Sequence, residues 1–387
     1  MAEPIEQGAV LVLDEIVRRA VRAKASDVHL EPKRDRLNVR FRVDGEMVEE
    51  ESVPVDVALE VVSRVKVLAR MDIAERRLPQ DGQLTLSPNG ELVHLRASTF
   101  PSSLGEKVVL RILSGQTLIV FDRLGLEPAS QMIVRELVDR PQGFIVASGP
   151  TGAGKTSTLY SFIRLIDTRR TNVMTLEDPI EIELASITQG QTNLKAGFTF
   201  ATGLRAILRQ DPDVIMVGEI RDAETAGIAL QASLTGHLVL STLHTSDAVE
   251  SVVRLVDLGV EPWIIANALT AVLAQRLVRI VCKGCQEEVT LTHPIVDGDE
   301  TVIPAGAKVM RPRGCAQCLK TGYKGRTGIF ELVVVDDDMR ELVKAKASTR
   351  EYRQLLKKRG IQSLRRVGLQ LVKAGLTTVD EVVRVTT

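Results

Sequence analysis

The chain has 387 residues, 44% of them hydrophobic and 26% charged, which fits a soluble protein of two or three domains. Lysine plus arginine and aspartate plus glutamate number 50 each, and aromatic residues make up only 3%, which argues against a basic, base-stacking surface for nucleic acid. The N-terminus lacks a signal-peptide pattern, and the longest largely apolar stretch, residues 263–274, is too short to span a bilayer. We therefore expect a cytosolic protein with reduced thiols.

Residues 1–113 predict an α/β module. Apolar residues recur with helical spacing at 9–24 and 57–69. Period-2 patterns and flanking turns predict strands at 26–32, 37–43, 46–48, 83–86, 93–98 and 108–113. Residues 114–126 hold Gly115 and Gly125 without sustained periodicity, so they predict a linker that serves as a hinge.

Residues 127–278 predict a parallel sheet with helices on both faces, because helical and strand patterns alternate. The predicted helices are 130–139, 156–166, 202–208 and 223–234. The predicted strands are 144–147, 173–176, 214–217 and 238–242.

A complete phosphate-binding loop of the pattern GxxxxGK[ST] occupies residues 149–156, between a predicted buried strand and a predicted helix. Its glycines let backbone N–H groups converge on the β-phosphate of ATP. Lys155 is expected to reach the β- and γ-phosphates, and Thr156 to bind Mg²⁺. A glycine-rich turn without nucleotide is the alternative, which the joint match of motif and context disfavours. The expected nucleotide-binding residues are Gly149, Pro150, Thr151, Gly152, Ala153, Gly154, Lys155, Thr156 and Ser157.

Two acidic segments follow apolar strands, so we expect them at the carboxyl edge of the sheet, where ligands bind in open α/β folds. Residues 213–219 form a Walker B-like strand that ends in Glu219, and Gly218 stands where generic P-loop proteins often have aspartate. Glu219 is therefore expected to work alone, holding Mg²⁺ directly or through water. In the cluster 177–181, Glu177 is the candidate for orienting or deprotonating the attacking water. A solvated acidic loop is the alternative.

Two histidines, His237 and His244, bracket the predicted strand 238–242. Each one taken singly is more often structural than functional. Because of its place at the end of this strand, His244 is the candidate for sensing the γ-phosphate through a hydrogen bond.

The chain has four cysteines, in two pairs of CxxC spacing, at Cys282, Cys285, Cys315 and Cys318. Two such pairs complete a tetrahedral Zn²⁺ site with no position open for water, which is a structural site. Four unrelated thiols or two disulfides are the alternative, and a redox pair of the thioredoxin type would be single. The cysteine module is placed at 279–325, and 326–387 is predicted to be mostly helical, with interruptions at Gly360 and Gly375.

The motifs together resemble the ATPases of type II secretion and type IV pilus systems, of the general secretory pathway protein E type. The resemblance runs from about residue 25 to the C-terminus and is carried by ordered boxes at 149–156, 175–181, 204–222 and 235–247. It implies a PAS-like N-terminal module and a RecA-like motor with a tetracysteine insert. Retraction motors usually lack that insert. Residues 278–282, 325–331 and 376–382 look closer to the type II secretion branch than to pilus extension.

The resemblance also implies a function. Members form hexameric rings that use ATP and Mg²⁺ at the cytoplasmic face of the inner membrane, and drive assembly of pilin-like subunits. Implied partners are a second copy of the chain, a membrane-anchored docking protein, a polytopic platform protein and, indirectly, pseudopilins, with no nucleic acid. Members commonly carry a further N-terminal docking domain, which this sequence does not show.

The same resemblance implies that arginines of the N-terminal module complete a neighbouring subunit's site. The candidates are Arg40 and Arg42 on a predicted strand and Arg76 and Arg77 before residues 79–82. A guanidinium there would stabilise charge on the transferred phosphoryl group. The alternative for each is a solvated strand edge or loop. Two alternative functions from other classes of protein remain for the whole chain. One is a RecA-like DNA translocase, and the other is a nucleotide-binding scaffold that does not hydrolyse ATP.

Overall fold

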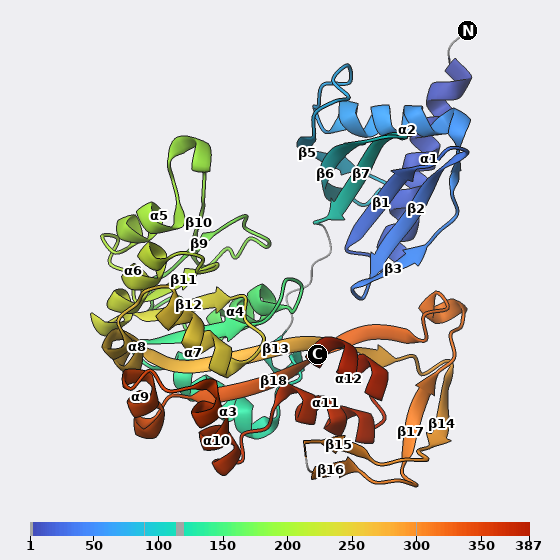
Figure 1. Ribbon diagram of the computed structural model, residues 1–387. Helices are drawn as coiled ribbons and strands as arrows, with labels where there is room; N and C mark the ends of the chain where they lie inside the picture. The colour runs from blue at the N-terminus through green and yellow to red at the C-terminus, as the bar shows by residue number, and fades with distance from the viewer. Residues whose placement is uncertain (1–2, 89, 114–119, 299) are drawn as a thin grey trace. The chain divides into compact units, whose positions relative to one another are not determined.

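The computed structural model describes residues 3–88, 90–113, 120–298 and 300–387. The chain divides into two compact units, Met1–Thr117 and Leu118–Thr387. Within the described residues, no helix is both long and apolar enough to cross a bilayer. The predicted mixed α/β class is confirmed in both units (Figure 1).

The first unit is an antiparallel sheet covered by two helices. Its strands lie in the order β3-β2-β1-β7-β6-β5, and β4 pairs with β2. The helices are α1 (Glu3–Arg22) and α2 (Val55–Leu68). The strands are β1 (Asp27–Pro32), β2 (Arg36–Val43), β3 (Glu46–Glu49), β4 (Val53–Pro54), β5 (Gln80–Leu86), β6 (Val93–Ser102) and β7 (Gly105–Ile112).

The sheet of this unit has one apolar face and one charged face, because side chains alternate along each strand. Val28 and Leu30 of β1 and Phe41 of β2 are buried against α1 and α2 in one core cluster. The opposite face carries ion pairs that join neighbouring strands, such as Arg40 to Glu31 at 2.6 Å. The alternation read from the sequence therefore assigns these faces correctly.

The second unit is built on a sheet of strand order β10-β9-β11-β12-β8-β13-β18, parallel except for the last pair. Its first elements are η1 (Phe121–Arg123), α3 (Pro128–Val138), β8 (Gly143–Ser148), α4 (Lys155–Ile163), β9 (Val173–Glu177), β10 (Thr188–Gln191) and η2 (Leu194–Ala196). They are followed by α5 (Phe200–Ile207), β11 (Val214–Val217), α6 (Ala223–Leu234), β12 (Leu238–Leu243), α7 (Ala248–Asp257), α8 (Pro262–Ala268) and β13 (Leu269–Val281).

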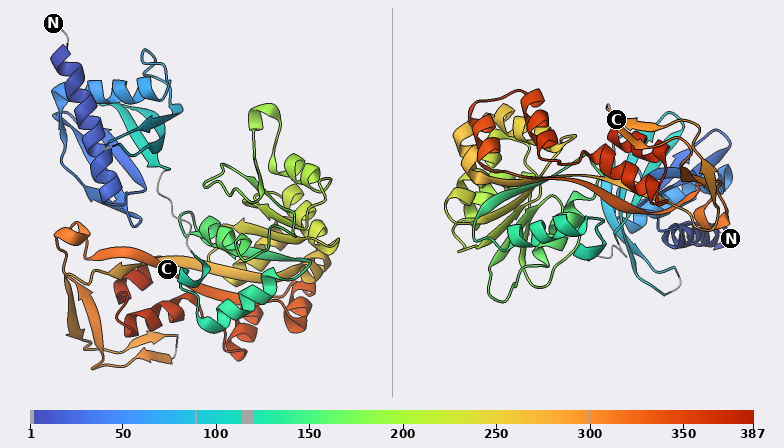
Figure 2. Two further views of the ribbon diagram at one scale, coloured as in Figure 1. Left: turned by 180° about the vertical axis from the view of Figure 1, so that it is seen from behind. Right: turned by 90° about the horizontal axis from the view of Figure 1, so that it is seen from below.

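Helices cover both faces of this sheet, as the alternating pattern predicted (Figure 2). Phe144 and Val146 of β8 face a core that includes α5 to α10, whereas Ile145 and Ala147 face a core with η1, α3 and α4. The strands are therefore buried on both sides, which explains their nearly continuous apolar runs.

The linker expected at residues 114–126 is corrected in its last part. Residues 114–119 lie outside the described residues. Phe121, Leu124 and Leu126 are each at most 5% exposed and pack in the core against α3 and α4. These three apolar side chains anchor the segment to the second unit, so residues 121–126 are not part of a hinge.

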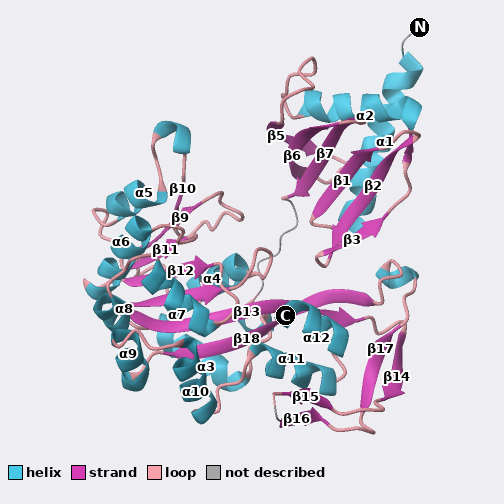
Figure 3. Ribbon diagram, in the orientation of Figure 1, coloured by secondary structure: helices cyan, strands magenta, loops and turns pink. Residues whose placement is uncertain are grey.

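The segment 326–387 is also not a separate helical subdomain. The elements after β13 are β14 (Gln286–Thr290), β15 (Ile295–Asp297), β16 (Glu300–Ile303), β17 (Lys308–Pro312), η3 (Ala316–Cys318), β18 (Tyr323–Val334), α9 (Asp337–Lys344), α10 (Thr349–Lys358), α11 (Leu364–Lys373) and α12 (Val379–Thr386). β18 is the edge strand of the central sheet, and α9 and α10 bury Met339 and Tyr352 in its core. α11 and α12 also form a small cluster with β16 and β17 of the cysteine module (Figure 3), while Leu364 of α11 belongs to the core of the central sheet.

Candidate active site and metal centre

The phosphate-binding loop follows β8, and α4 begins at Lys155. Gly149 has φ +151°, and a Cβ added there would lie 2.6 Å from the carbonyl oxygen of Gln275. Gly154, at φ +87°, is the N-cap of α4 and has no side-chain cap, which leaves the first-turn amides for an anion. Both glycines are therefore required by backbone conformation, and Gly149 also by the close approach of β13.

Lys155 is turned back over this loop and buried. Its Nζ donates to the carbonyl oxygens of Gly149 at 2.8 Å and Pro150 at 3.1 Å. Burial lowers the pKa of Lys155 to about 8, while the Glu219 carboxylate favours the charged form. Among the described residues, no carboxylate contacts the Lys155 ammonium directly. The ammonium is therefore suited to pairing with phosphate.

Glu219 lies just beyond β11, at the same edge of the sheet. Its carboxylate pairs with Arg221 at 2.7 Å, and Nε2 of His244 lies 3.3 Å from its other oxygen. A Cβ at Gly218 would lie 3.3 Å from the carbonyl oxygen of Leu176 on β9. A side chain at position 218 would therefore press tightly against the neighbouring strand, which disfavours an aspartate there.

His244 follows β12 and faces the same carboxylate. Burial and then the nearby Lys155 ammonium lower the pKa of His244, so the imidazole is neutral near pH 7. The structure thus brings Lys155, Glu219 and His244 close together at this edge of the sheet, while their roles stay predictions. His237 lies at the opposite end of β12 and contacts the Ala232 carbonyl at 2.9 Å, in agreement with its structural interpretation.

Glu177 ends β9 and is 2% exposed. One carboxylate oxygen accepts hydrogen bonds from Thr175 at 2.6 Å and Gln189 at 3.0 Å, and the other accepts one from the hydroxyl of Tyr160 on α4. Burial and this carboxylate raise the pKa of Tyr160, so its hydroxyl remains the donor. In this conformation both oxygens of Glu177 are therefore engaged by side chains of β9, β10 and α4.

Two polar residues of β13, Gln275 and Arg276, were missed by the sequence analysis. Nε2 of Gln275 donates to the carbonyl of Ala153 in the phosphate loop at 2.6 Å, and Oε1 of Gln275 is buried without a partner in the described part of the chain. The guanidinium of Arg276 donates hydrogen bonds to the backbone carbonyls of Ser246, Gln275 and Val385. The one available signal in the sequence was that these two polar residues interrupt an otherwise apolar run. Such an interruption does not by itself show which residues, more than 100 positions away, they contact.

The four candidate arginines lie in the first unit, Arg40 and Arg42 on β2 and Arg76 and Arg77 on the segment before β5. Arg40 pairs with Glu31 at 2.6 Å, and Arg42 donates to the carbonyl of Gly45 at 2.9 Å. Arg76 and Arg77 are exposed on the segment before β5, where Arg77 pairs with Glu75 at 2.8 Å. Their expected role toward a neighbouring subunit stays a prediction.

The four cysteines converge, with all sulfur atoms within 4.8 Å of one another. Three Sγ–Sγ distances are 3.8 to 3.9 Å, far longer than a disulfide bond. Tetrahedral zinc with Zn–S bonds of about 2.3 Å requires Sγ–Sγ distances of about 3.8 Å, so the sulfurs fit this ion. Gly314 has φ +91°, and a Cβ there would lie 2.4 Å from the Lys320 carbonyl, so the second turn requires glycine.

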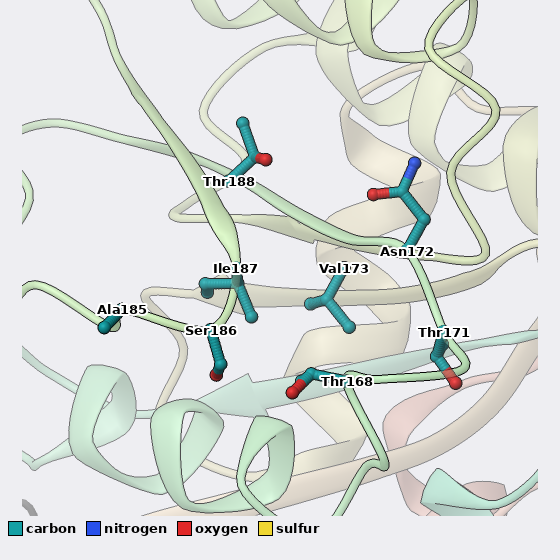
Figure 4. Close-up of a pocket in the computed structure, with 8 residues that line it drawn as sticks. All are labelled: Thr168, Thr171, Asn172, Val173, Ala185, Ser186, Ile187 and Thr188. Atoms are coloured by element: carbon teal, nitrogen blue, oxygen red, sulfur yellow. The ribbon is translucent and has the colours of Figure 1, made fainter.

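A shallow cavity of about 320 Å³ lies elsewhere on this unit, lined by residues that include Asn172, Val173 and Thr188 (Figure 4). These residues lie at the amino ends of β9 and β10. The phosphate loop follows the carboxyl end of β8, which belongs to the same parallel set. The cavity is therefore at the opposite edge of the sheet from the phosphate loop.

Comparisons with known proteins agree with this arrangement. The family model described as "Type II/IV secretion system protein" matches residues 3–384. The type II secretion system protein E of Pseudomonas aeruginosa is 48% identical over 381 residues, covering 97% of this chain and 75% of the relative. The type II secretion system ATPase E of Vibrio cholerae is 44% identical, covering 97% and 75%. The type IV pilus assembly ATPase TfpB of Acinetobacter baylyi is 43% identical, covering 98% and 66%.

Solved structures show the same fold. The pilus retraction motor PilT with bound ADP superposes with a TM-score of 0.64 at 26% identity, covering 96% of each chain. The Legionella pneumophila ATPase DotB gives 0.70 at 22% identity, covering 97% of this chain and 95% of that one. With the family model and the relatives above, these findings show that the chain belongs to the type II/IV secretion system protein family and is a secretion ATPase.

Proposed function

We propose that the chain is a magnesium-dependent ATPase motor that assembles as a hexamer and powers pseudopilus assembly and protein export in type II secretion. The observation that carries the proposal is the grouping of Lys155, Glu219 and His244 at the carboxyl edge of the parallel sheet, beside a helix N-terminus. The high identity to type II secretion ATPases over almost the whole chain supports the pathway.

Each residue has a proposed role in phosphoryl transfer to water. Backbone amides of the loop 149–156 and the Lys155 ammonium bind the β- and γ-phosphates. Thr156 and Glu219 would hold Mg²⁺, which when bound neutralises charge on the phosphate oxygens. The neutral imidazole of His244 reports the γ-phosphate through a hydrogen bond. Glu177 orients the attacking water after one of its present hydrogen-bond donors is exchanged.

The first unit supplies arginines to an adjacent copy of the chain. Arg40, Arg42, Arg76 and Arg77 are the candidates, and a guanidinium next to the transferred phosphoryl group would favour the transition state. We propose that the motor works at the cytoplasmic face of the inner membrane, with a membrane-anchored docking protein and a polytopic platform protein as partners.

The cysteine module is proposed to hold one structural Zn²⁺ through Cys282, Cys285, Cys315 and Cys318. These thiolates would fix the two turns against each other and stiffen the module as a contact surface for a membrane partner. A pilus-extension motor is the second candidate function, favoured by the 43% identity to a type IV pilus assembly ATPase.

The test is steady-state ATP hydrolysis by the full chain with and without Mg²⁺. Lys155→Ala and Glu219→Gln should each reduce kcat at least about 100-fold, because the first removes a cation that pairs with the phosphates and the second weakens the hold on Mg²⁺. Lys344→Ala is the matched control, since this lysine is exposed on α9 and forms its ion pair with Glu341 of the same helix. Turnover that needs no Mg²⁺, or that survives both changes, would refute the motor assignment. In cells with a type II pathway, the same variants should abolish export but leave pilus extension unaffected, and the reverse result would select the second candidate.

A further inference from the structure

Arg276 is a half-buried cation whose hydrogen bonds, in the described part of the chain, all go to backbone carbonyls. Its guanidinium donates to the carbonyl oxygens of Gln275 at 3.0 Å, Ser246 at 2.7 Å and Val385 at 3.0 Å. Among the described residues, no carboxylate lies within direct ion-pair distance of it, although three carboxylates lie nearby. The carboxylates of Asp247, Glu250 and Glu331 are near enough to favour the charged form of Arg276. Its direct hydrogen-bond partners are neutral carbonyls that include two distant in the chain, so the guanidinium joins the segments that carry them.

The first contact segment leads directly to the proposed phosphate site. Ser246 lies two residues after His244, which faces Glu219 at 3.3 Å. The segment is fastened to the start of α7, where the side chain of Asp247 accepts a hydrogen bond from the Glu250 amide at 2.7 Å. The guanidinium also approaches the phosphate loop, with Nη1 3.4 Å from a Cβ built on Gly149. A movement of His244 would therefore reach Arg276 through one short, hydrogen-bonded turn.

The second contact segment is the end of α12, which accepts the hydrogen bond through Val385. The start of this helix is fixed to the base of the cysteine module. Glu381, buried in its first turn, binds the guanidinium of Arg279 at 2.7 Å, and Thr378 meets the Tyr323 hydroxyl at 2.8 Å. Arg279 lies on β13 three residues before Cys282, and Tyr323 opens β18 after Cys318. Helix α12 is thus joined at its end to Arg276 and in its first turn to Arg279, both on β13, the strand that enters the cysteine module.

We propose that Arg276 is a positioning residue that joins the turn after His244 to helix α12, and so couples nucleotide binding energetically to the base of the cysteine module. Arg276 acts through backbone carbonyls and does not itself bind the reacting atoms. The proposal rests on the nucleotide site proposed above. Its consequence is that occupancy of that site changes the stability of α12, and that the change passes through this one side chain.

The test is hydrogen–deuterium exchange on the full chain, with and without the non-hydrolysable analogue AMP-PNP and Mg²⁺. In the wild type, the analogue should slow exchange of amides in 379–387 at least about 5-fold, the lower end of a typical coupling. In Arg276→Gln that difference should disappear, whereas analogue binding itself should weaken by no more than about 10-fold. Arg276→Lys should keep part of the difference, because an ammonium can reach one or two of the three carbonyls.

Arg340→Gln is the matched control, because Arg340 also donates to a carbonyl, that of Ala266, in the same unit but away from α12. It should retain the wild-type response. Equal protection of α12 in wild type and Arg276→Gln, or none in a wild type that binds the analogue, would overturn the proposal. A wild type that does not bind the analogue would instead reject the proposed nucleotide site, so the two failures are distinguishable. Thermal unfolding of each variant reports whether the fold is retained.

Discussion

Glu331 is expected to make the stability of the second unit depend on pH. This residue of β18 is 7% exposed, and its carboxylate accepts a hydrogen bond from the Ala248 amide at the start of α7, at 3.0 Å. Burial raises the pKa of Glu331 from 4.5 to about 7, and Asp247 adds to the rise. The backbone hydrogen bonds from Ala248 and Leu364 and the charge of Arg353 oppose it. The folded state therefore keeps a proton on Glu331 that the unfolded state has lost.

The magnitude follows from this pKa difference. One pKa unit corresponds to about 1.36 kcal/mol, so the rise from 4.5 to about 7 corresponds to about 3 kcal/mol. The stability contributed by the protonated form is fully present below the unfolded pKa of 4.5 and is lost as pH rises through about 7. About 2 kcal/mol of this change falls between about pH 5.5 and 8, a range in which the four cysteines can still hold a metal ion.

The perturbation is Glu331→Gln, which keeps the shape and an acceptor oxygen but cannot ionise. Thermal unfolding midpoints of wild type and variant are compared across about pH 5.5 to 8 by calorimetry. As pH rises over this range, the unfolding midpoint of the variant should increase relative to that of the wild type by about 4 to 8 °C. This is because about 1 kcal/mol shifts the midpoint of a unit of this size by about 2 to 4 °C. All other titrating groups cancel in the difference between the two proteins. Glu341→Gln, an exposed change on α9, is the control and should follow the wild type. If Glu331→Gln also follows the wild type at every pH, the buried-carboxyl explanation is wrong.

Two further predictions concern a buried ion pair and the metal centre. Lys66 is 1% exposed and forms an ion pair with the Glu106 carboxylate at 2.8 Å. Lys66→Met leaves that carboxylate buried without its partner and should lower the free energy of unfolding, measured in urea, by about 3 to 5 kcal/mol. The double variant Lys66→Met with Glu106→Leu should recover most of this loss. Equal destabilisation in the single and double variants would contradict the uncompensated-charge argument. Cys285→Ser should reduce zinc, measured by atomic emission, from one ion per chain to a small fraction of that, and a chelator should lower the unfolding midpoint of the wild type but not of the variant. A wild type purified without zinc and insensitive to the chelator would show that the sulfur cluster is not a zinc site.

Much of the secondary structure could be predicted because its signals are local. The continuous apolar runs of β8 and β11 and the alternation along β2 depend only on neighbouring residues. The strand β13 was not predicted, because the apolar run that holds α8 and β13 contains no turn signal, and periodicity cannot separate a buried strand from a buried helix. The edge strand β10 was missed because its sequence, Thr-Gln-Gly-Gln, has no apolar pattern.

The sequence by itself determined the chemistry that depends on contiguous motifs: the phosphate loop with Lys155, the strand that ends at Glu219, and two CxxC turns. In each, a few adjacent residues impose both the backbone conformation and the reactive groups. Only the tertiary structure decided which groups meet across the fold. It placed Arg276 between Ser246 and Val385, put Glu331 at the start of α7, and engaged Glu177 with Tyr160. The physical reason is that these contacts join segments distant in the chain, and their partners are set by strand order and helix packing, which no local pattern contains.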